Sequence, residues 1–216
     1  SYGAAWAYKP TMQGNTLWLD YESESESDFA RRRYGLSMGG LDYYPGSIRW
    51  MPGGGVPLPE LVDVLKNEMR AYSCKVLVVD SVLYACGGNP SDAETATAFY
   101  NALSQLPVST KILIAHCDKA ENNKYPFGSI MWHNGVHGMS WYVEGSGGGS
   151  ELTVGWYGRK GSNARQEDFA IKYVFEDGGI YMEQGVLLAL GSAGSANTPT
   201  NANKIIGRGC NACHQQ

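Results

Sequence analysis

The sequence predicts an α/β protein with a central parallel sheet, and three observations carry this prediction. Short apolar runs alternate with amphipathic helical patterns as far as residue 116. One of these runs, "VLVVD" at residues 76–80, is apolar until it closes on aspartate, which is typical of a parallel strand buried on both faces. After residue 137 the pattern becomes a series of strand-like segments joined by glycine-rich turns, which predicts C-terminal antiparallel strands.

The first expected elements lie between residues 16 and 72. "TLWLDYE" (16–22) is an apolar run that closes on acidic residues, and we interpret it as a strand. "SESESDFARRRYGL" follows with Ser and Glu placed to begin a helix, and residues 47–51 form a second, shorter strand candidate. "PGGGVP" then interrupts the chain. Residues 59–72 carry apolar side chains at helical spacing, namely Leu61, Val62, Leu65 and Met69.

The later elements complete the predicted domain. "NPSDAETATAFYNALSQL" begins with capping residues and continues as an amphipathic helix, and "KILIAH" (111–116) is a further buried strand. "MSWYVEG", "ELTVGWYGRK", "DFAIKYVFEDG" and "GIYMEQG" are the expected antiparallel strands, with "SGGGS" and "DGG" as hairpin turns. Residues 191–204 are rich in Gly, Ser, Ala, Asn, Thr and Pro. We therefore expect one domain over residues 1–190 and a flexible tail over 191–216.

Composition narrows the class of protein. A chain of 216 residues, 43% hydrophobic and 18% charged, suits a globular domain with a sizeable core. A formal net charge of −4 argues against a surface that coats nucleic acid, although a local basic groove remains compatible with it. No apolar run reaches the roughly 18 residues of a membrane-spanning helix, and no signal peptide opens the chain. We therefore expect no membrane partner. An odd number of cysteines, five, without a secretory signal suits a reducing cytoplasm better than a disulfide framework.

Polar residues close three of the apolar runs, and they are the candidate catalytic and binding residues. In a parallel sheet, Glu22, Asp80 and His116 would all lie at the carboxyl edge, where α/β folds bind ligands. There Asp80 could hold Mg²⁺ beside a triphosphate, Glu22 could orient a water, and His116 could contact the γ-phosphate. Each residue could instead be a solvated strand end, and Asp80 could simply cap the next turn.

Several segments resemble the RecA-like ATPases of the RepA replicative-helicase type. They are "TLWLDYES", "KVLVVDSVLYACGGNPSDAETATAFYNAL", "KILIAHCDK", "PFGSIMWHNGVHGMSWYVE" and "GRKGSNARQEDFAIKYVFEDGG". The resemblance covers about residues 16–183, and its "ACGGNP" and "PFGS" segments are more specific than the strand that ends at Asp80. It implies a RecA-like core and a homo-hexameric motor that hydrolyses ATP with Mg²⁺ between subunits. It also implies action on single-stranded DNA in replication or recombination.

The resemblance implies roles for individual residues. Asp80 matches the Walker B aspartate, which holds Mg²⁺ through water, and Ser81 beside it would contact the nucleotide. Glu22 matches the catalytic carboxylate and His116 the sensor of the next strand. Arg159 and Lys160 match a basic pair that reaches the neighbouring subunit's γ-phosphate, although "GRKG" could instead be a solvated hairpin tip.

The segment "GSIMWHNGVHGMSW" corresponds to the place where RecA-like motors carry a DNA-facing loop. Its side chains could stack on or bond to a threaded strand, and those we assign to nucleic acid are Trp132, His133, Asn134 and His137. Packing in the core is the alternative for the two tryptophans of this segment, and we favour it for Trp141.

One departure from the family is serious. The family carries a Gly-rich loop ending in Gly-Lys-Ser/Thr ahead of the "LWLDYE" strand, and no such motif occurs in the 216 residues. We expect either an N-terminally incomplete domain or a variant without the phosphate cradle, and in both cases weak nucleotide binding by this chain. A non-hydrolysing RecA-fold module for assembly or nucleic-acid binding is therefore the alternative function, and whether the chain is an enzyme stays open.

The tail contains C-x-x-C-H, formed by Cys210, Cys213 and His214. This spacing is the attachment pattern of c-type haem, which would make the chain an exported haem protein. The same three side chains could offer ligands to zinc, one fewer than a closed structural site needs. A chance match is the interpretation we favour, ahead of a metal site and then haem, because too little chain follows to enclose a haem.

Overall fold

The structure is a computed structural model that describes residues 14–23, 25–40, 46–117, 125–161 and 167–187. The described residues form two compact units. The first comprises those within Met12–Phe29 and Tyr43–His137, and the second those within Ala30–Asp42 and Gly138–Gln216. Among the helices formed by these residues, none is long and apolar enough to cross a membrane.

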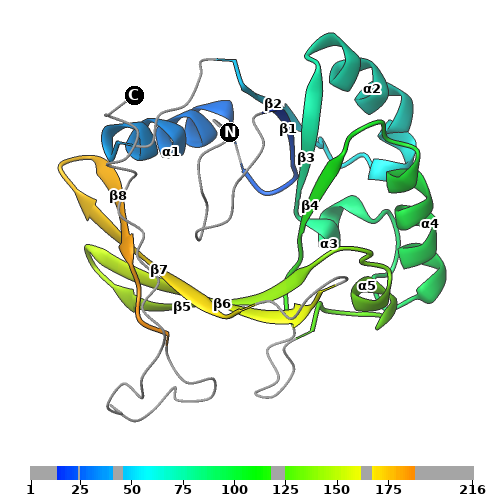
Figure 1. Ribbon diagram of the computed structural model, residues 1–216. Coiled ribbons are helices and arrows are strands. Elements are labelled where there is room, and N and C mark those ends of the chain that lie inside the picture. Colours follow the sequence, from blue (N-terminus) through cyan, green and yellow to red (C-terminus); the bar gives the residue numbers. More distant parts are fainter. Residues whose placement is uncertain (1–13, 24, 41–45, 118–124, 162–166, 188–216) are drawn as a thin grey trace. The chain divides into compact units, whose positions relative to one another are not determined.

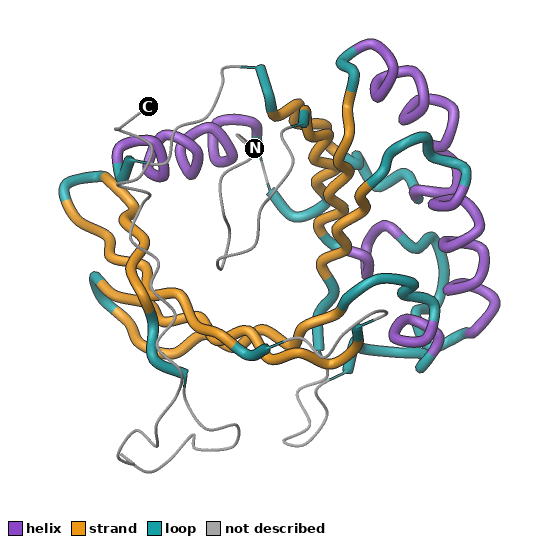
Figure 2. Tube along the Cα trace, in the orientation of Figure 1, coloured by secondary structure: helices purple, strands orange, loops and turns teal. Residues whose placement is uncertain are grey.

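A four-stranded parallel sheet forms the centre of the first unit, with the strand order β2-β1-β3-β4. The strands are β1 (Asn15–Asp20), β2 (Ile48–Pro52), β3 (Cys74–Asp80) and β4 (Thr110–Ile114). Strands and helices alternate along this part of the chain, as Figure 2 shows. The prediction of a parallel α/β sheet is therefore confirmed.

The helices of the first unit lie on one side of this sheet (Figure 1). They are α2 (Leu58–Ala71), α3 (Val82–Ala85), α4 (Ala93–Ser104) and α5 (Met131–Asn134). The sheet face beneath them contributes Leu17, Leu19, Leu77 and Val79, all fully buried. Leu65 of α2 and Phe99 of α4 pack into the same core, because apolar residues recur there at helical spacing. This packing fixes the strands whose carboxyl ends carry the candidate site.

Strand β4 corrects one expectation. Its sequence, "TKILI", has the apolar character of a strand at the centre of a sheet, but within the described residues β4 pairs with β3 alone and forms an edge. Ile112 and Ile114 are consequently 49% and 38% exposed, whereas Val78 on β3 is 5% exposed. An apolar pattern indicates that a strand belongs to a parallel sheet, but it does not give the order of strands.

The second unit contains a four-stranded antiparallel sheet with the order β5-β6-β7-β8. Its strands are β5 (Ser140–Gly148), β6 (Glu151–Lys160), β7 (Phe169–Glu176) and β8 (Gly179–Gln184). Asp177 and Gly178, both with positive φ, form the two-residue turn between β7 and β8, as expected for an Asp-Gly hairpin. The prediction of antiparallel strands after residue 137 is confirmed.

The two faces of the antiparallel sheet differ in polarity. On one face the Trp156 ring stacks on Phe169, with centroids 5.6 Å apart and an interplanar angle of 6°. On the other, Lys172 Nζ lies 2.6 Å from Glu151 Oε1 and 3.9 Å from Glu183 Oε2. Helix α1 (Glu26–Met38) contributes residues to both units.

Candidate functional site

Three parallel strands end side by side at the candidate site. The register pairs Asp20 of β1 with Asp80 of β3, and Asp80 in turn with Ile114 of β4. Glu22 and His116 each follow two residues after the end of their strand, rather than closing it as the sequence suggested. Nε2 of His116 lies 2.6 Å from Oε1 of Glu22. The structure thus brings together Glu22 and His116 next to the strand that ends at Asp80.

The environment of Glu22 favours its ionised form. Partial burial alone would raise the pKa of this carboxyl, and the negative charge of Asp20 acts in the same direction. Ser81 and His116, through their polar groups and the charge of the imidazole, outweigh both effects and hold the pKa below its usual value. An ionised carboxylate against an imidazole can accept a proton or orient a water.

Ser81 lies directly after β3 and is fully buried. Its hydroxyl lies close enough to Glu22 to lower the pKa of that carboxyl. It does not, however, reach hydrogen-bonding geometry with any atom of the described residues. A buried hydroxyl without a partner is uncommon and unfavourable. Its position between β3 and Glu22 makes Ser81 a group that could bond to a ligand at the sheet edge.

Asp20 is a site residue that the sequence analysis missed. Its side chain is 2% exposed, and Oδ1 accepts the backbone N–H groups of Glu22 and Ser23 at 2.9 and 2.8 Å. Oδ2 accepts the indole N–H of Trp50 at 2.9 Å. Burial would raise the pKa of Asp20, but the Ser23 hydroxyl together with these donors outweighs it, and the pKa lies below the usual value. "LWLD" and "VLVVD" share an aspartate at the end of an apolar run, and this signal could have identified Asp20 from the sequence.

The carboxylates of Glu22 and Asp80 at this edge suit a divalent cation better than a phosphate group, whereas both oxygens of Asp20 are engaged within the fold. Carboxylate oxygens are the ligands that Mg²⁺ prefers, and Mg²⁺ commonly completes its shell with waters and substrate phosphates. Among the described residues, no three His, Cys, Asp or Glu side chains cluster as a ready-made metal site. A Mg²⁺ ion at Asp80 would therefore depend on water and on the phosphates it accompanies.

The glycine-rich turn "PGGGVP" lies between β2 and α2, but it is a poor phosphate cradle. Its Gly53 N–H donates to the Asp20 carbonyl at 2.7 Å, and its Val56 N–H donates back to Gly53 at 3.0 Å. Pro57 and Pro59 have no N–H groups to offer at the start of α2, and Glu60 adds a carboxylate to the first turn. This turn joins β2 to α2 and does not replace the Gly-Lys-Ser/Thr loop that the sequence lacks.

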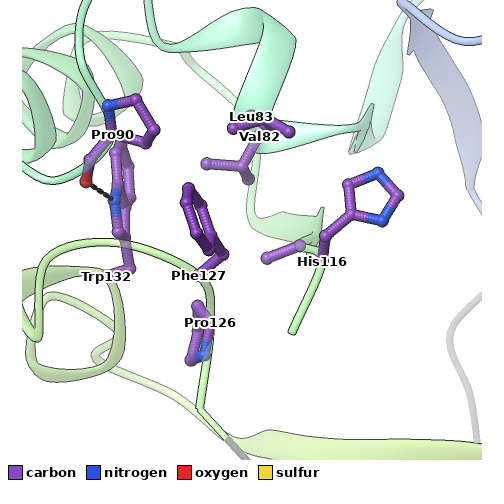
Figure 3. A pocket seen from close by; sticks show the side chains of 8 residues that line it. Val82, Leu83, Pro90, His116, Pro126, Phe127 and Trp132 are labelled. Carbon is purple, nitrogen blue, oxygen red and sulfur yellow. Dashed lines mark hydrogen bonds between the residues drawn. The ribbon is translucent and has the colours of Figure 1, made fainter. Parts of the chain in front are cut away.

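A small cavity adjoins His116 (Figure 3). Its volume is about 10 Å³, and apolar side chains line most of it. In Figure 3 the Phe127 ring lies between His116 and Trp132, and the Trp132 indole points to the Pro90 carbonyl. A cavity of this size has room for about one water molecule. It is too small to receive a nucleotide base.

Trp132 belongs to the core, which corrects its assignment to nucleic acid. The side chain is 3% exposed, and its indole N–H donates to the Pro90 carbonyl at 2.8 Å. Its ring lies 5.4 Å from that of Phe99. Gly128 admits this packing, because a Cβ there would overlap the Pro90 carbonyl and φ is +98°. A ring buried in this way offers no face to a nucleic-acid base.

The other residues assigned to nucleic acid lie nearer the surface. Asn134 and His137 are exposed, and His133 is half-buried. The His133 ring contacts Tyr125 edge-on, with centroids 4.9 Å apart. Their contact with DNA stays a prediction.

Arg159 and Lys160 lie at the end of β6, in the second unit, whereas Asp80 belongs to the first. The Arg159 guanidinium lies over the Tyr142 ring, 5.6 Å from its centroid. Their action on a neighbouring subunit stays a prediction. Cys210, Cys213 and His214 lie outside the described residues.

Comparison with known proteins supports the fold. No family model matches the chain, and no curated protein matches it in sequence. Among solved structures, the chain is similar to a KaiC-like protein from the hyperthermophilic archaeon Pyrococcus horikoshii, with a TM-score of 0.54 and 14% identity. The similarity covers 78% of this chain and 75% of that one. The chain therefore has a RecA-like α/β fold.

Proposed function

We propose that the chain is the RecA-fold ATPase domain of a RepA-like DNA helicase, with its nucleotide site at the carboxyl edge of the parallel sheet. The observation that carries the proposal is the 2.6 Å contact between Glu22 and His116 beside the strand that ends at Asp80. In α/β sheets, ligands bind at this edge. The resemblance to the RepA type supports the helicase assignment, a homo-hexameric ring and single-stranded DNA as partner.

Each residue of the proposed site has one task. Glu22 orients the attacking water, since its carboxylate is ionised and half-exposed. Asp80 holds Mg²⁺ through water, and Ser81 offers its buried hydroxyl to the nucleotide. His116 contacts the γ-phosphate and keeps Glu22 in place. Mg²⁺, when bound, neutralises phosphate charge during transfer.

A titration with MgATP tests the proposed site in the chain as it stands. We expect the backbone NMR signals of Glu22, Ser81 and His116 to shift with a dissociation constant in the millimolar range, because the phosphate-loop contacts are absent from the sequence. Asp80→Asn should abolish these shifts, whereas the matched replacement Asp63→Asn, on the exposed face of helix α2, should leave them unchanged. Shifts spread evenly over the chain, or none at all, would contradict the proposal.

The second candidate is a RecA-fold module that does not hydrolyse nucleotide. The absence of Gly-Lys-Ser/Thr from the 216 residues favours it. The two candidates predict different phosphate release once a Gly-rich loop and its strand are fused ahead of Ser1. An ATPase should then release phosphate in a Glu22-dependent manner, whereas a module for assembly or DNA binding should not.

A further inference from the structure

Asp20 is a buried carboxylate to which the proposed chemistry gives no task. It lies at the end of β1 and is 2% exposed. Burying a carboxylate is unfavourable unless hydrogen-bond donors compensate for the lost water. The groups that supply those donors therefore indicate what the residue does.

All but one of the groups that donate to Asp20 belong to the turn that carries Glu22. Oδ1 of Asp20 accepts the N–H groups of Glu22 and Ser23, at 2.9 and 2.8 Å, and the Ser23 hydroxyl also stabilises the carboxylate. The remaining donor is the indole N–H of Trp50 on the neighbouring strand β2, 2.9 Å from Oδ2. Because Trp50 holds the second oxygen, the carboxylate is fixed in the orientation that serves the turn.

The two residues before Glu22 are anchored to the rest of the sheet edge. The Tyr21 N–H donates to the Asp80 carbonyl at 2.6 Å, and the Tyr21 hydroxyl donates to the Val56 carbonyl at 2.8 Å. The Asp20 carbonyl accepts the Gly53 N–H at 2.7 Å. The turn is thus tied to β3 and to the loop after β2, and Glu22 extends from it to His116.

We propose that Asp20 is the positioning residue of the site: its carboxylate fixes the turn that presents Glu22 to His116. The inference rests on the proposed function, in which Glu22 orients the attacking water, and Asp20, buried and bonded within the fold, acts through Glu22. An aspartate that served packing alone could be replaced by an apolar residue of similar size without altering the contact between Glu22 and His116. This difference can be measured.

The measurement uses the imidazole NMR signals of His116, identified from the spectrum of a His116→Gln variant. Glu22→Gln should displace these signals in the wild-type background, since it changes the group that contacts Nε2. In an Asp20→Leu background we expect this displacement to be lost. In the background Asp20→Asn with Trp50→Phe it should be retained, because the amide keeps the Oδ1 acceptor and Trp50→Phe removes the donor that would oppose its NH₂ group.

Asp168→Ala is the control background. Asp168 also accepts a backbone N–H with Oδ1, that of Gly158 at 2.8 Å, but it belongs to the second unit. Its replacement should leave the displacement at His116 unchanged. A change there would mean that the signals report general destabilisation, and the proposal would be overturned.

An unchanged displacement in folded Asp20→Leu overturns the proposal, because Asp20 would then serve packing alone. Loss of the displacement with Asp20→Asn and Trp50→Phe also overturns it, since charge and not the turn would then be responsible. If Asp20→Leu does not fold, Asp20→Ala replaces it, and failure of both to fold overturns the proposal, because Asp20 would then be required for the fold as a whole.

Nucleotide is absent from this experiment, so the two proposals can fail separately. If His116 responds as expected and MgATP causes no shifts, the positioning of Glu22 by Asp20 stands and the nucleotide site fails. If MgATP binds at the edge and Asp20→Leu leaves the His116 response intact, the site stands and the role of Asp20 fails.

Discussion

Nε2 of His116 lies 2.6 Å from Oε1 of Glu22, across 94 positions of the sequence. The two side chains are 50% and 34% exposed, so water screens the pair and its contribution to stability is small. A contact of this kind contributes about 0–1 kcal/mol to a fold. Its replacement therefore tests the site with little effect on folding.

We expect Glu22→Gln to lower the free energy of unfolding by less than about 1 kcal/mol at pH 7. The folded-state pKa of Glu22 is depressed, so its charge stabilises the protein above an unfolded-state pKa of about 4.3 and loses this effect as pH falls through the folded value. The difference between wild type and variant should thus shrink between pH 7 and pH 3. Urea unfolding at both pH values measures it, with the exposed Glu167→Gln as control; a difference that grows in acid would contradict the prediction.

Two aliphatic residues on adjacent strands test the edge position of β4. Val78→Ala on β3 should cost about 1–3 kcal/mol, because the side chain is 5% exposed and its loss leaves a cavity. Ile112→Ala on β4 removes more atoms but should cost about 0.5 kcal/mol or less, since Ile112 is 49% exposed. Urea unfolding of both variants measures this order. The reverse order would mean that another segment covers β4 in solution.

The sequence predicted the strands well and their order only in part. Apolar runs identified β1, β3 and β4 to within two residues, because each strand is a short, nearly continuous apolar segment bounded by polar residues. The position of β4 at an edge could not be predicted, since strand order depends on contacts between distant segments. The short helix α5 was also missed, because "MWHN" gives only four residues of pattern.

The sequence predicted those site residues that a single strand end identifies. It did not predict the contacts that form between two segments distant in the sequence. Glu22, Asp80 and His116 stood out because each follows an apolar run. The bond between Trp50 and Asp20 joins neighbouring strands, and nothing local in either segment indicates it. The burial of Trp132 depends in the same way on the Pro90 carbonyl, 42 positions earlier. Nonlocal hydrogen bonds of this kind appear only once the fold is known.

Replacement of Trp132 and of His137 distinguishes a role in core packing from a role in nucleic-acid binding. Trp132→Ala should cost about 3–5 kcal/mol, because it empties a core site and leaves the Pro90 carbonyl without the indole donor. His137→Ala should leave the free energy of unfolding within about 0.5 kcal/mol of wild type, since the residue is exposed. If this segment binds single-stranded DNA, His137→Ala should weaken binding in a fluorescence anisotropy titration. Equal binding by wild type and His137→Ala would remove His137 from the DNA surface.

Arg159 and Arg49 form a matched pair of surface arginines. Each guanidinium lies over a tyrosine ring, at 5.6 Å from Tyr142 and 4.8 Å from Tyr72, respectively. Replacement of either by Ala should cost about 0.5–1 kcal/mol, the usual value of an exposed cation–π contact. In a version that carries a phosphate-binding loop, Arg159→Ala should also lower ATPase activity by roughly 10³-fold, and Arg49→Ala should not. Equal activities would reduce Arg159 to a surface residue.

Residues 1–216 alone should not hydrolyse ATP at a measurable rate. The sequence lacks the loop whose backbone N–H groups and lysine would neutralise β- and γ-phosphate charge. Each charge-assisted hydrogen bond contributes about 1.5–3 kcal/mol, so the loss of three weakens binding by about 10³-fold or more. A micromolar site would become millimolar, and the phosphate would lack the contacts that align it with Glu22.

We therefore expect no measurable phosphate release with Mg²⁺ and single-stranded DNA. We expect turnover once a Gly-rich loop and its strand are fused ahead of Ser1, and Glu22→Gln should abolish it. Robust turnover by the unmodified chain would mean that other groups hold the phosphates.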